Sequence, residues 1–273
     1  MSLRVHLVDG TYELFRAHFS KRPPRRDAAG KDIKAAWGVK QSMEALLKDR
    51  AEAVTHLAIA FDNPIRSFRN ALFAGYKTEE GVPPELLAQF DDVERLVADL
   101  GLTVWSMKDF EADDALATGA AVFAKNKRVD QVRILTPDKD LGQCLLGERV
   151  VQVDRMRERT ITEDSFRADK GFSPHSIPDY LALVGDSADG IPGIDGWGEK
   201  GTAAVLSVYP HLEDIPDDES VWKVIPRGAA RLAENLRTHR KEATLYRTLA
   251  TVRTDAPIDT KLEALTVPSG RTS

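Results

Sequence analysis

Carboxylates follow four separate strand-like runs of this sequence, and that repetition constrains the fold more than any other feature. The runs at 3–8, 57–61, 102–105 and 132–135 are rich in β-branched and other apolar residues, and a fifth run covers 150–153. Helical patterns lie between them, at 35–48, 86–100 and 112–124. Strands that alternate with helices predict an α/β fold, with a central, mostly parallel sheet flanked by helices.

The acids that follow these runs are expected to meet at one edge of the sheet. Asp9 follows the first run, Asp62 the second, Glu111 the third, and Asp138 and Asp140 the fourth. In an open parallel sheet, ligands bind at the carboxyl ends of the strands. One acid after one strand is ordinary turn chemistry, but four strands that deliver acids to the same edge indicate a shared site.

The stretch 110–115, F-E-A-D-D-A, places three carboxylates at the start of an apolar helix. The helix macrodipole stabilises an acid there by only about 0.3–1 kcal/mol, while neighbouring carboxylates repel one another. We therefore expect cations to neutralise them. Glu111 and Asp113 would diverge if both lay on one helix, so we place Glu111 on the turn that leads into the helix, where it can converge with Asp113.

Hard divalent cations fit this set of side chains better than other metals. Mg²⁺ and Mn²⁺ prefer carboxylate oxygens, and two such ions about 3.5–4 Å apart form a common hydrolytic centre. Zinc is disfavoured because the chain has one Cys and its six His are scattered. The candidate metal ligands, including a later pair, are Asp9, Asp62, Glu111, Asp113, Asp114, Asp138, Asp140, Asp186 and Asp189.

Composition limits the cellular setting. Of the 273 residues, 42% are hydrophobic and 30% are charged, as in soluble globular proteins. The single Cys144 excludes an intramolecular disulfide, and no apolar run suits a signal peptide or a membrane span. We expect a cytoplasmic monomer with no membrane partner. The net charge of −5 does not exclude nucleic acid, because basic residues cluster at 21–26, 155–159 and 237–241.

Five blocks of this sequence resemble the bacterial 5′-nucleases, or flap endonucleases, a family that includes the N-terminal nuclease domain of DNA polymerase I. The blocks are L-V-D-G-T-Y-E-L-F-R-A, F-D-N-P-I-R-S-F-R-N, F-E-A-D-D-A, T-P-D-K-D-L-G-Q and V-G-D-S-A-D-G-I-P-G-I-D-G-W-G-E-K. They occur in the family's order over roughly residues 3–255. The resemblance implies a PIN-like 5′-nuclease fold with a C-terminal helical region that contains a helix-hairpin-helix.

The same resemblance suggests how the chain is divided. A metal-binding α/β nuclease core is expected at 1–175, with a helical arch near 76–91. The helix-hairpin-helix and further helices are expected at 176–257, and a loosely held tail at 258–273.

The resemblance also implies roles for individual site residues. Matching positions place Asp9, Asp62, Glu111 and Asp113 near one divalent ion, and Asp138, Asp140, Asp186 and Asp189 near a second ion, with Asp114 in support. For Asp114 and Asp186, support of other ligands is as plausible as direct ligation. Arg69 and Lys77 match the family positions that contact the scissile phosphate.

Further DNA contacts are implied at two places. Phe15 stands where the family usually has Tyr, and it either stacks on a nucleobase or packs into the core, while Arg16 also matches the family. The segment G-I-D-G-W-G-E-K looks like the hairpin of a helix-hairpin-helix, whose N–H groups bind duplex phosphates without reading sequence. Its candidate DNA-binding residues are Gly193, Gly196, Gly198 and Lys200. In the family, a potassium ion often bridges this hairpin and the DNA.

Two positions depart from the family pattern. Glu80 stands where Arg is common, and Asp195 stands where Pro is usual. Both acids are expected to weaken the grip on DNA phosphates.

The leading hypothesis is a metal-dependent, structure-specific 5′-3′ exonuclease and 5′-flap endonuclease that hydrolyses DNA phosphodiesters by a two-metal mechanism, in replication and repair. The expected partners are branched or 5′-flap duplex DNA and a DNA polymerase in trans, because the chain ends where the family's polymerase domain would begin. The alternatives are a non-catalytic binder of branched DNA and a related metal-dependent ribonuclease. The complete set of acids counts against the binder, and the Gly-rich hairpin counts against the ribonuclease.

Overall fold

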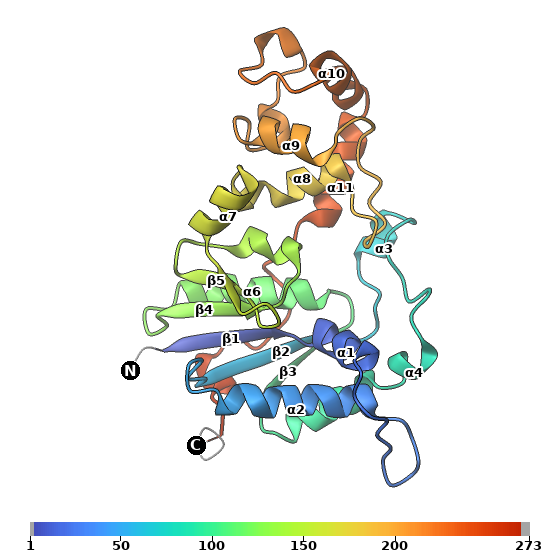
Figure 1. The fold of residues 1–273 in the computed structure, drawn as a ribbon, viewed down its shortest axis with the longest axis vertical. Helices are drawn as coiled ribbons and strands as arrows, with labels where there is room; N and C mark the ends of the chain where they lie inside the picture. The colour runs from blue at the N-terminus through green and yellow to red at the C-terminus, as the bar shows by residue number, and fades with distance from the viewer. Residues whose placement is uncertain (1–2, 269–273) are drawn as a thin grey trace.

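A six-stranded sheet forms the centre of the α/β part of the molecule in the computed structural model, which describes residues 3–268 (Figure 1). The strand order is β3-β2-β1-β4-β5-β6, and every neighbouring pair is parallel except β5 and β6. The strands are β1 (Arg4–Asp9), β2 (His56–Asp62), β3 (Thr103–Met107), β4 (Gln131–Leu135), β5 (Val150–Asp154) and β6 (Arg159–Ile161).

The sheet confirms the predicted α/β class and all five predicted strands. The antiparallel edge strand β6 is absent from the prediction because it has only three residues, two of them polar and exposed. Such a short strand carries no usable alternation of apolar and polar positions.

Helices cover both faces of the sheet. The elements on one face are α1 (Gly10–Phe19), α2 (Lys34–Lys48) and α5 (Phe90–Ala98), and α6 (Ala112–Ala124) covers the other. Along β1, Val8 packs toward α1 and α2, whereas Leu7 packs toward α6. This alternation follows from the strand period of two residues, and it buries the sheet between two apolar layers.

The helix predicted at 86–100 is divided in two. The structure has a single turn, α4 (Pro84–Leu87), and then α5. Between them lies Gln89, whose fully buried side chain accepts hydrogen bonds from the backbone N–H groups of Ala35 and Ala36. Gln89 therefore caps the start of α2, a contact between segments more than 50 residues apart.

The helical arch expected near 76–91 is mostly loop, and the expectation is correct only for α4 and the first residues of α5. The preceding helix α3 (Arg69–Leu72) is also a single turn. Gly81, with φ of 84°, and the pair Pro83 and Pro84 interrupt any longer helix in this segment.

The C-terminal part of the chain is helical, as predicted, and stacks beyond the β5 side of the sheet (Figure 1). Its helices are α7 (Glu163–Lys170), α8 (Ile177–Val184), α9 (Glu199–Leu206), α10 (Ala229–Thr238) and α11 (Arg240–Ala250). Short 3₁₀ helices are η1 (Lys139–Cys144), η2 (Pro174–Ser176), η3 (Leu212–Asp214), η4 (Glu219–Val221) and η5 (Leu262–Leu265). A hydrophobic cluster that includes Leu183, Trp197 and Leu249 holds this region together.

The segment predicted as a loose tail is packed as far as residue 268. Leu262 and Leu265 are buried under the face of the sheet that α6 covers. The N–H group of Val267 donates to the carbonyl of Thr55 at 3.0 Å, which adds a backbone contact beside β2. The expectation of a loose tail is wrong as far as residue 268, because the apolar side chains of this segment pack against a part of the sheet that is distant in sequence. Residues 269–273 of the predicted tail, Ser273 among them, lie outside the described residues.

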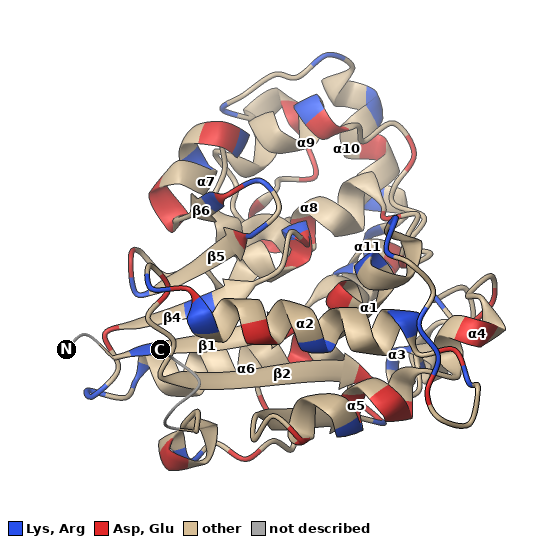
Figure 2. Cartoon of the chain, turned by 60° about the horizontal axis from the view of Figure 1, so that its bottom comes forward, with Lys and Arg blue, Asp and Glu red and all other residues tan. Residues whose placement is uncertain are grey.

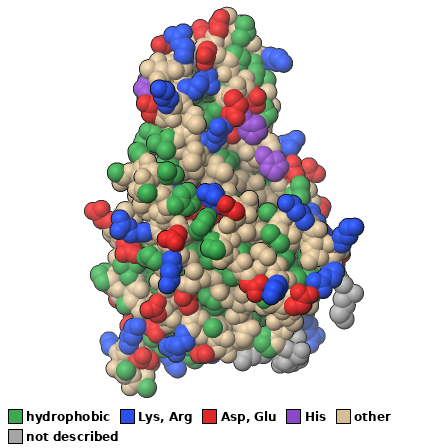
Figure 3. Space-filling model, turned by 180° about the vertical axis from the view of Figure 1, so that it is seen from behind, with side chains coloured by type: hydrophobic (Ala, Val, Ile, Leu, Met, Phe, Trp, Pro, Cys, Tyr) green, Lys and Arg blue, Asp and Glu red, His purple; other side chains and the backbone are tan. Residues whose placement is uncertain are grey.

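Charged side chains of both signs share the surface. Figure 3 shows Lys, Arg, Asp and Glu side chains interspersed over the rear face of the molecule. The loop between α1 and α2 carries a basic group, Lys21, Arg22, Arg25 and Arg26 (Figure 2). Within residues 3–268, no helix combines the length and the apolar character needed to cross a membrane.

Replacing Leu265 by Ala tests the packing of the C-terminal segment. Leu265 is 1% exposed, so Leu265→Ala is expected to lower the free energy of unfolding by about 2–5 kcal/mol. Urea denaturation measures this change. Ile225 is 80% exposed, and Ile225→Ala should change the free energy by less than about 0.5 kcal/mol. Equal effects of the two substitutions would contradict the packing of this segment.

Candidate functional site

The acids at the ends of β1 and β2 meet the start of α6, as the sequence predicted. Asp9 ends β1 and caps α1, since its Oδ1 accepts from the backbone N–H of Tyr12 at 2.8 Å. Its Oδ2 accepts from the Thr136 hydroxyl, just beyond β4. Asp62 ends β2, and its Oδ1 accepts from the backbone N–H of Ala112 at 2.7 Å. Three adjacent strands and one helix therefore share this edge.

Glu111 lies on the turn before α6, as predicted. It is the N-cap residue, with extended backbone angles, and its backbone N–H donates to Asp114 Oδ2 at 2.9 Å. Its side chain accepts from the Ser67 hydroxyl at 2.7 Å and contacts three further groups, described below. The capping position turns Glu111 away from the helix and toward the other acids.

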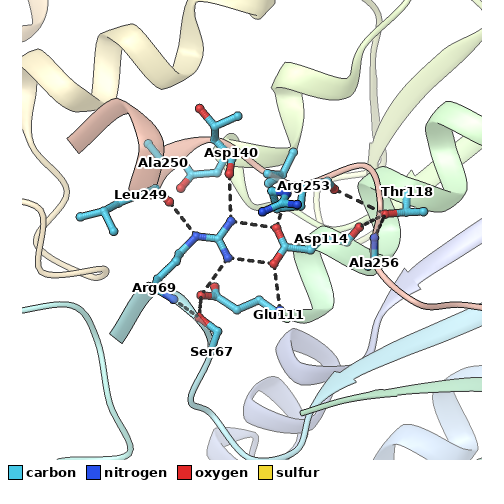
Figure 4. Close-up of polar contacts among 12 residues, drawn as sticks. Ser67, Arg69, Glu111, Asp114, Thr118, Asp140, Leu249, Ala250, Arg253 and Ala256 are labelled. Carbon is cyan, nitrogen blue, oxygen red and sulfur yellow. Dashed lines mark hydrogen bonds and ion pairs between the residues drawn. The ribbon is translucent and has the colours of Figure 1, made fainter. Parts of the chain in front are cut away.

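Arg69 is buried in an ion pair with Asp114, which is fully buried (Figure 4). Two of its N–H groups donate to the two oxygens of Asp114, each at 2.8 Å, and a third donates to Glu111 at 3.2 Å. The other two donate to the backbone carbonyls of Leu249 and Thr251. A guanidinium group has five N–H donors, so all of them are used.

These contacts favour a role for Arg69 in holding the site together over contact with the scissile phosphate. Arg69 is 2% exposed, and its donors are satisfied by groups that include carbonyls about 180 residues away in sequence. It fixes Asp114 and Glu111 at the start of α6. Asp114 also accepts from the backbone N–H of Arg253, so both of its oxygens are occupied by contacts within the chain.

Lys77 lies between the two groups of acids that the resemblance defined. Its Nζ is 3.0 Å from Glu111 Oε2 and 3.0 Å from Asp189 Oδ1. The hydroxyl of Tyr76 contacts the same two carboxylates, at 3.2 and 3.3 Å. The side chain of Lys77 is one quarter exposed, and its ammonium group lies among Glu111, Asp189 and Tyr76.

The backbone near Lys77 is fixed against the loop that carries Asp189. The N–H of Lys77 donates to the carbonyl of Asp189 at 3.1 Å. Gly190 has φ of 73°, and a Cβ there would lie 2.0 Å from the carbonyl oxygen of Gly75. Only glycine permits this approach of the two chains.

Asp138, Asp140 and Asp186 form the remainder of the second group. Asp138 accepts from the backbone N–H of Asp140 at 2.9 Å, at the start of η1. Lys139 donates to Asp186 Oδ2 at 2.5 Å, and its Nζ lies 3.6 Å from Asp140 Oδ1. The pKa of Asp186 is lowered because this ion pair outweighs burial.

Burial and mutual repulsion raise the pKa of Asp9, Asp113 and Asp140, and for Asp140 they outweigh the nearby charge of Lys139. Burial, with the charges of neighbouring carboxylates, raises the pKa of Asp9 to about 7 and that of Asp140 to about 7. Burial and the charges of Asp138 and Asp9 raise the pKa of Asp113 well above its ordinary value. Glu111 behaves in the opposite way: burial disfavours its charge, but Lys77 and Arg69 lower its pKa to about 2.

The donor chemistry fits a hard divalent ion. Carboxylates of two groups converge, and the buried Asp140 Oδ1 has no hydrogen-bond partner. Among residues 3–268, however, no three His, Cys, Asp or Glu side chains already form a group that could hold a metal ion. The ammonium groups of Lys77 and Lys139 lie among the acids and neutralise them.

The two residues of α1 that were predicted to contact DNA, Phe15 and Arg16, both contact other parts of the protein. Phe15 is partly buried and packs on the hydrophobic cluster of α2 and α5. This agrees with the alternative that Phe15 packs into the core. Arg16 pairs with Glu13 and lies 3.3 Å from the Ser42 hydroxyl. Both residues therefore have partners within the chain.

The Gly-rich segment lies on the loop between α8 and α9. Gly193 and Gly196 have φ of 74° and 84°, and Gly198 is the N-cap residue of α9. Lys200 is exposed in the first turn of α9. Gly196, Gly198 and Lys200 are exposed, so the start of α9 lies at the surface, while the N–H of Gly198 donates to the carbonyl of Gly196 at 3.1 Å.

Asp195, expected to repel phosphate, is itself neutralised. Its carboxylate accepts from Arg231 at 2.5 Å, and its backbone carbonyl accepts from Asn235 at 2.7 Å. Arg231 and Asn235 lie on α10, so the tertiary structure supplies the partners of this acid.

Ser67, Tyr76 and Lys139 are site residues that the sequence motifs did not indicate. Lys139 lies between two candidate ligands, and Tyr76 precedes Lys77, so position in the motifs could have indicated both. Ser67 gives no such signal, since its contact with Glu111 spans 44 residues.

Comparisons with known proteins identify the family of both parts of the chain. Residues 4–171 match the family described as 5′-3′ exonuclease, N-terminal resolvase-like domain. Residues 172–272 match the family described as 5′-3′ exonuclease, C-terminal SAM fold.

Curated relatives agree. A 5′-3′ exonuclease of Aquifex aeolicus is 31% identical over 226 residues, which cover 82% of this chain and 76% of that protein. DNA polymerase I of Pseudomonas aeruginosa is 34% identical over 269 residues, which cover 95% of this chain. The match spans only 28% of that polymerase.

Solved structures share the fold. A T5 5′-exonuclease with divalent metal ions (zinc) bound has a TM-score of 0.71 at 18% identity, covering 92% of this chain and 90% of that chain. A T5 flap endonuclease in a pseudo-enzyme-product complex with DNA and metal ions has a TM-score of 0.66 at 18% identity, with coverage of 92% and 90%.

Replacing Arg69 tests its assigned structural role. Arg69→Met leaves Asp114 buried without its partner, so the free energy of unfolding should fall by about 3–5 kcal/mol. Urea denaturation measures the loss, with Arg66→Met, at an exposed neighbouring arginine, as the control. Adding Asp114→Asn to Arg69→Met should recover part of the loss. Wild-type stability in Arg69→Met would contradict the assignment.

The stability of the chelator-treated protein should depend on pH through the buried acids. The folded pKa of Asp9, about 7, exceeds the ordinary value of 3.8. Below about pH 4, Asp9 is protonated in both the folded and the unfolded protein, and its contribution to the free energy of unfolding is most favourable. As the pH rises toward 7, the unfolded state loses this proton more readily than the folded state, so the free energy of unfolding falls. Thermal unfolding at pH 5 to 8 measures this slope. Asp9→Asn removes the titrating group and should flatten the slope, and an unchanged slope would contradict the assignment.

Proposed function

Since this chain belongs to the 5′-3′ exonuclease family, we propose that it hydrolyses DNA phosphodiesters as a structure-specific 5′-3′ exonuclease and 5′-flap endonuclease. The observation that carries the proposal is the convergence of two groups of carboxylates at one sheet edge, with Lys77 between them. No nucleophilic Ser or Cys is needed in such a site.

The proposal assigns two divalent ions, Mg²⁺ or Mn²⁺, to the two groups of acids. Asp9, Asp62, Glu111 and Asp113 would hold one ion, and Asp138, Asp140, Asp186 and Asp189 the other. Bound there, the ions would supply an activated water and neutralise charge on the reacting phosphate. The raised pKa of Asp9 and of Asp140 supports this assignment, because both groups gain from a nearby cation.

Lys77 is assigned to the scissile phosphate. Its ammonium group is a point charge on a side chain that is 26% exposed, whereas the guanidinium of Arg69 is enclosed and its donors are all used within the chain. The side chain of Asn70 donates to the Lys77 carbonyl at 2.9 Å, which holds the backbone below the ammonium group. The Tyr76 hydroxyl lies within hydrogen-bond distance of one carboxylate of each group and can donate its single proton to either Glu111 or Asp189.

Duplex DNA is assigned to the Gly-rich loop before α9. The N–H groups around Gly196 and Gly198, together with Lys200, would bind phosphates, with a potassium ion as a further bridge. Because Arg231 neutralises Asp195, the expected weakening of this contact is offset. The proposal includes action as a cytoplasmic monomer in replication and repair.

A non-catalytic binder of branched DNA is the second candidate. One observation favours it: within residues 3–268, no three acids are already grouped to hold a metal ion. The binder hypothesis predicts tight binding of flap DNA without cleavage.

Cleavage of a 5′-labelled flap duplex in Mg²⁺ or Mn²⁺ tests the proposal. The wild type should cut near the flap junction, and chelator should abolish the reaction. Asp113→Asn and Lys77→Ala should each lower the rate on the order of 10²-fold or more, because each removes charge that acts on the metal or phosphate. Gel analysis of the labelled products measures the rates.

Matched controls lie on the loop before α6. Asp109 and Lys108 are exposed, and Asp109→Asn and Lys108→Ala should retain the wild-type rate. Tight binding of the flap with no cleavage in either metal would favour the non-catalytic binder instead.

A further inference from the structure

A cavity of about 300 Å³ lies beside the second group of acids, between η1, the end of α7 and α8. Its apolar lining includes Phe172, Ile177 and Leu181, all buried. The charged groups that line it are Lys139, Lys170, Asp186 and Glu199. The cavity shares Lys139 and Asp186 with the site described above, but the residues that form its apolar wall have no part in that site.

An aromatic pair orders one wall of this cavity. The ring of Tyr180, on α8, stacks on Phe172 with 5.0 Å between centroids and 13° between planes. Phe172 is held edge-on by Phe166, at 5.6 Å and 88°. Tyr180 is only partly buried, and both it and Phe172 line the cavity. An aromatic ring whose plane is fixed in this way is a platform on which a planar ligand can stack.

The charges at the cavity suit a ligand that carries an anion and a polar planar group. The side chains of Lys139 and Lys170 are 60% and 53% exposed, and their ammonium groups pair with Asp186 at 2.5 Å and Asp169 at 3.4 Å, so a phosphate would bind in exchange for these surface contacts. Asp186 and Glu199 can accept hydrogen bonds from amino groups. A lone phosphate would not require the apolar wall, and a purely apolar ligand would not require the two lysines. A nucleotide has both an anionic phosphate for the lysines and a planar base for the apolar wall.

The place of Lys139 connects the cavity to the reaction site. Lys139 lies between Asp138 and Asp140 in sequence and bonds Asp186 in space. A nucleotide whose phosphate lies near these acids would therefore have its base within reach of Tyr180. We propose that the cavity binds one unpaired nucleobase of the DNA substrate, stacked against Tyr180, with the adjoining phosphate near Lys139 and Lys170. The inference rests on the proposed function for the identity of the ligand, but not on cleavage.

Binding of flap duplexes that each lack one base tests the inference. Fluorescence anisotropy with chelator present measures the dissociation constant for a series in which one nucleotide at a time is abasic. At one unpaired position, loss of the base should weaken binding by the wild type about fivefold or more, as loss of one base–aromatic stack does. Tyr180→Phe should retain this penalty, and Tyr180→Leu, which keeps apolar packing on Phe172, should remove it.

Substitution of Lys170, with Lys127 as the control, provides a second measurement. Lys170→Ala should weaken binding of the intact flap, whereas Lys127→Ala, at an exposed lysine just beyond the end of α6, should not. Unfolding midpoints of all variants are recorded beside the binding data, so that loss of the fold is recognised. If Tyr180→Leu is unfolded, the Lys170→Ala result decides, and wild-type binding by Lys170→Ala overturns the inference.

The outcomes separate this inference from the proposed function. A base-specific penalty that depends on Tyr180, in a protein that cleaves no flap, supports the cavity and counts against the nuclease. Cleavage without any Tyr180-dependent penalty overturns the cavity alone. If the wild type does not bind flap DNA at all, both the cavity inference and the proposed function are overturned.

Discussion

Repulsion among buried carboxylates is the constraint on which the rest of this structure depends. The ends of three parallel strands and the start of α6 bring acids to one edge, where burial makes each negative charge costly. The chain meets this cost with its own cations. Arg69 neutralises Asp114 and part of Glu111, Lys77 neutralises Glu111 and Asp189, and Lys139 neutralises Asp186.

These cations differ in what they can do next. Arg69 is held by five hydrogen bonds in fixed directions, and it is enclosed, so it belongs to the framework. Lys77 and Lys139 are single ammonium groups on flexible stems, partly open to solvent. The acids could therefore exchange Lys77 and Lys139 for other partners, while Arg69 keeps the start of α6 in place.

The site also joins the two parts of the chain that match separate family descriptions. Arg69 bonds carbonyls of Leu249 and Thr251 at the end of α11, and the loop of Asp189 and Gly190 packs on the backbone at Gly75 and Lys77. The close approach at Gly190 leaves no room for a side chain. The helical region therefore helps to build the site at the sheet edge, besides presenting the Gly-rich loop.

Local rules in the sequence determined much of this protein. Runs rich in β-branched and apolar residues predicted five of the six strands, the acids that follow them indicated a shared edge, and the two-residue spacing of Glu111 and Asp113 placed Glu111 before α6. These features depend on residues within a few positions of one another. Tertiary contacts decided the rest. The helix at 86–100 divides because Gln89 caps α2, residues 262–267 pack because the sheet offers them an apolar face, and Arg69 is enclosed because its acceptors lie about 180 positions away. No pattern within a short window of sequence contains such contacts, because the fold creates them by bringing distant segments together.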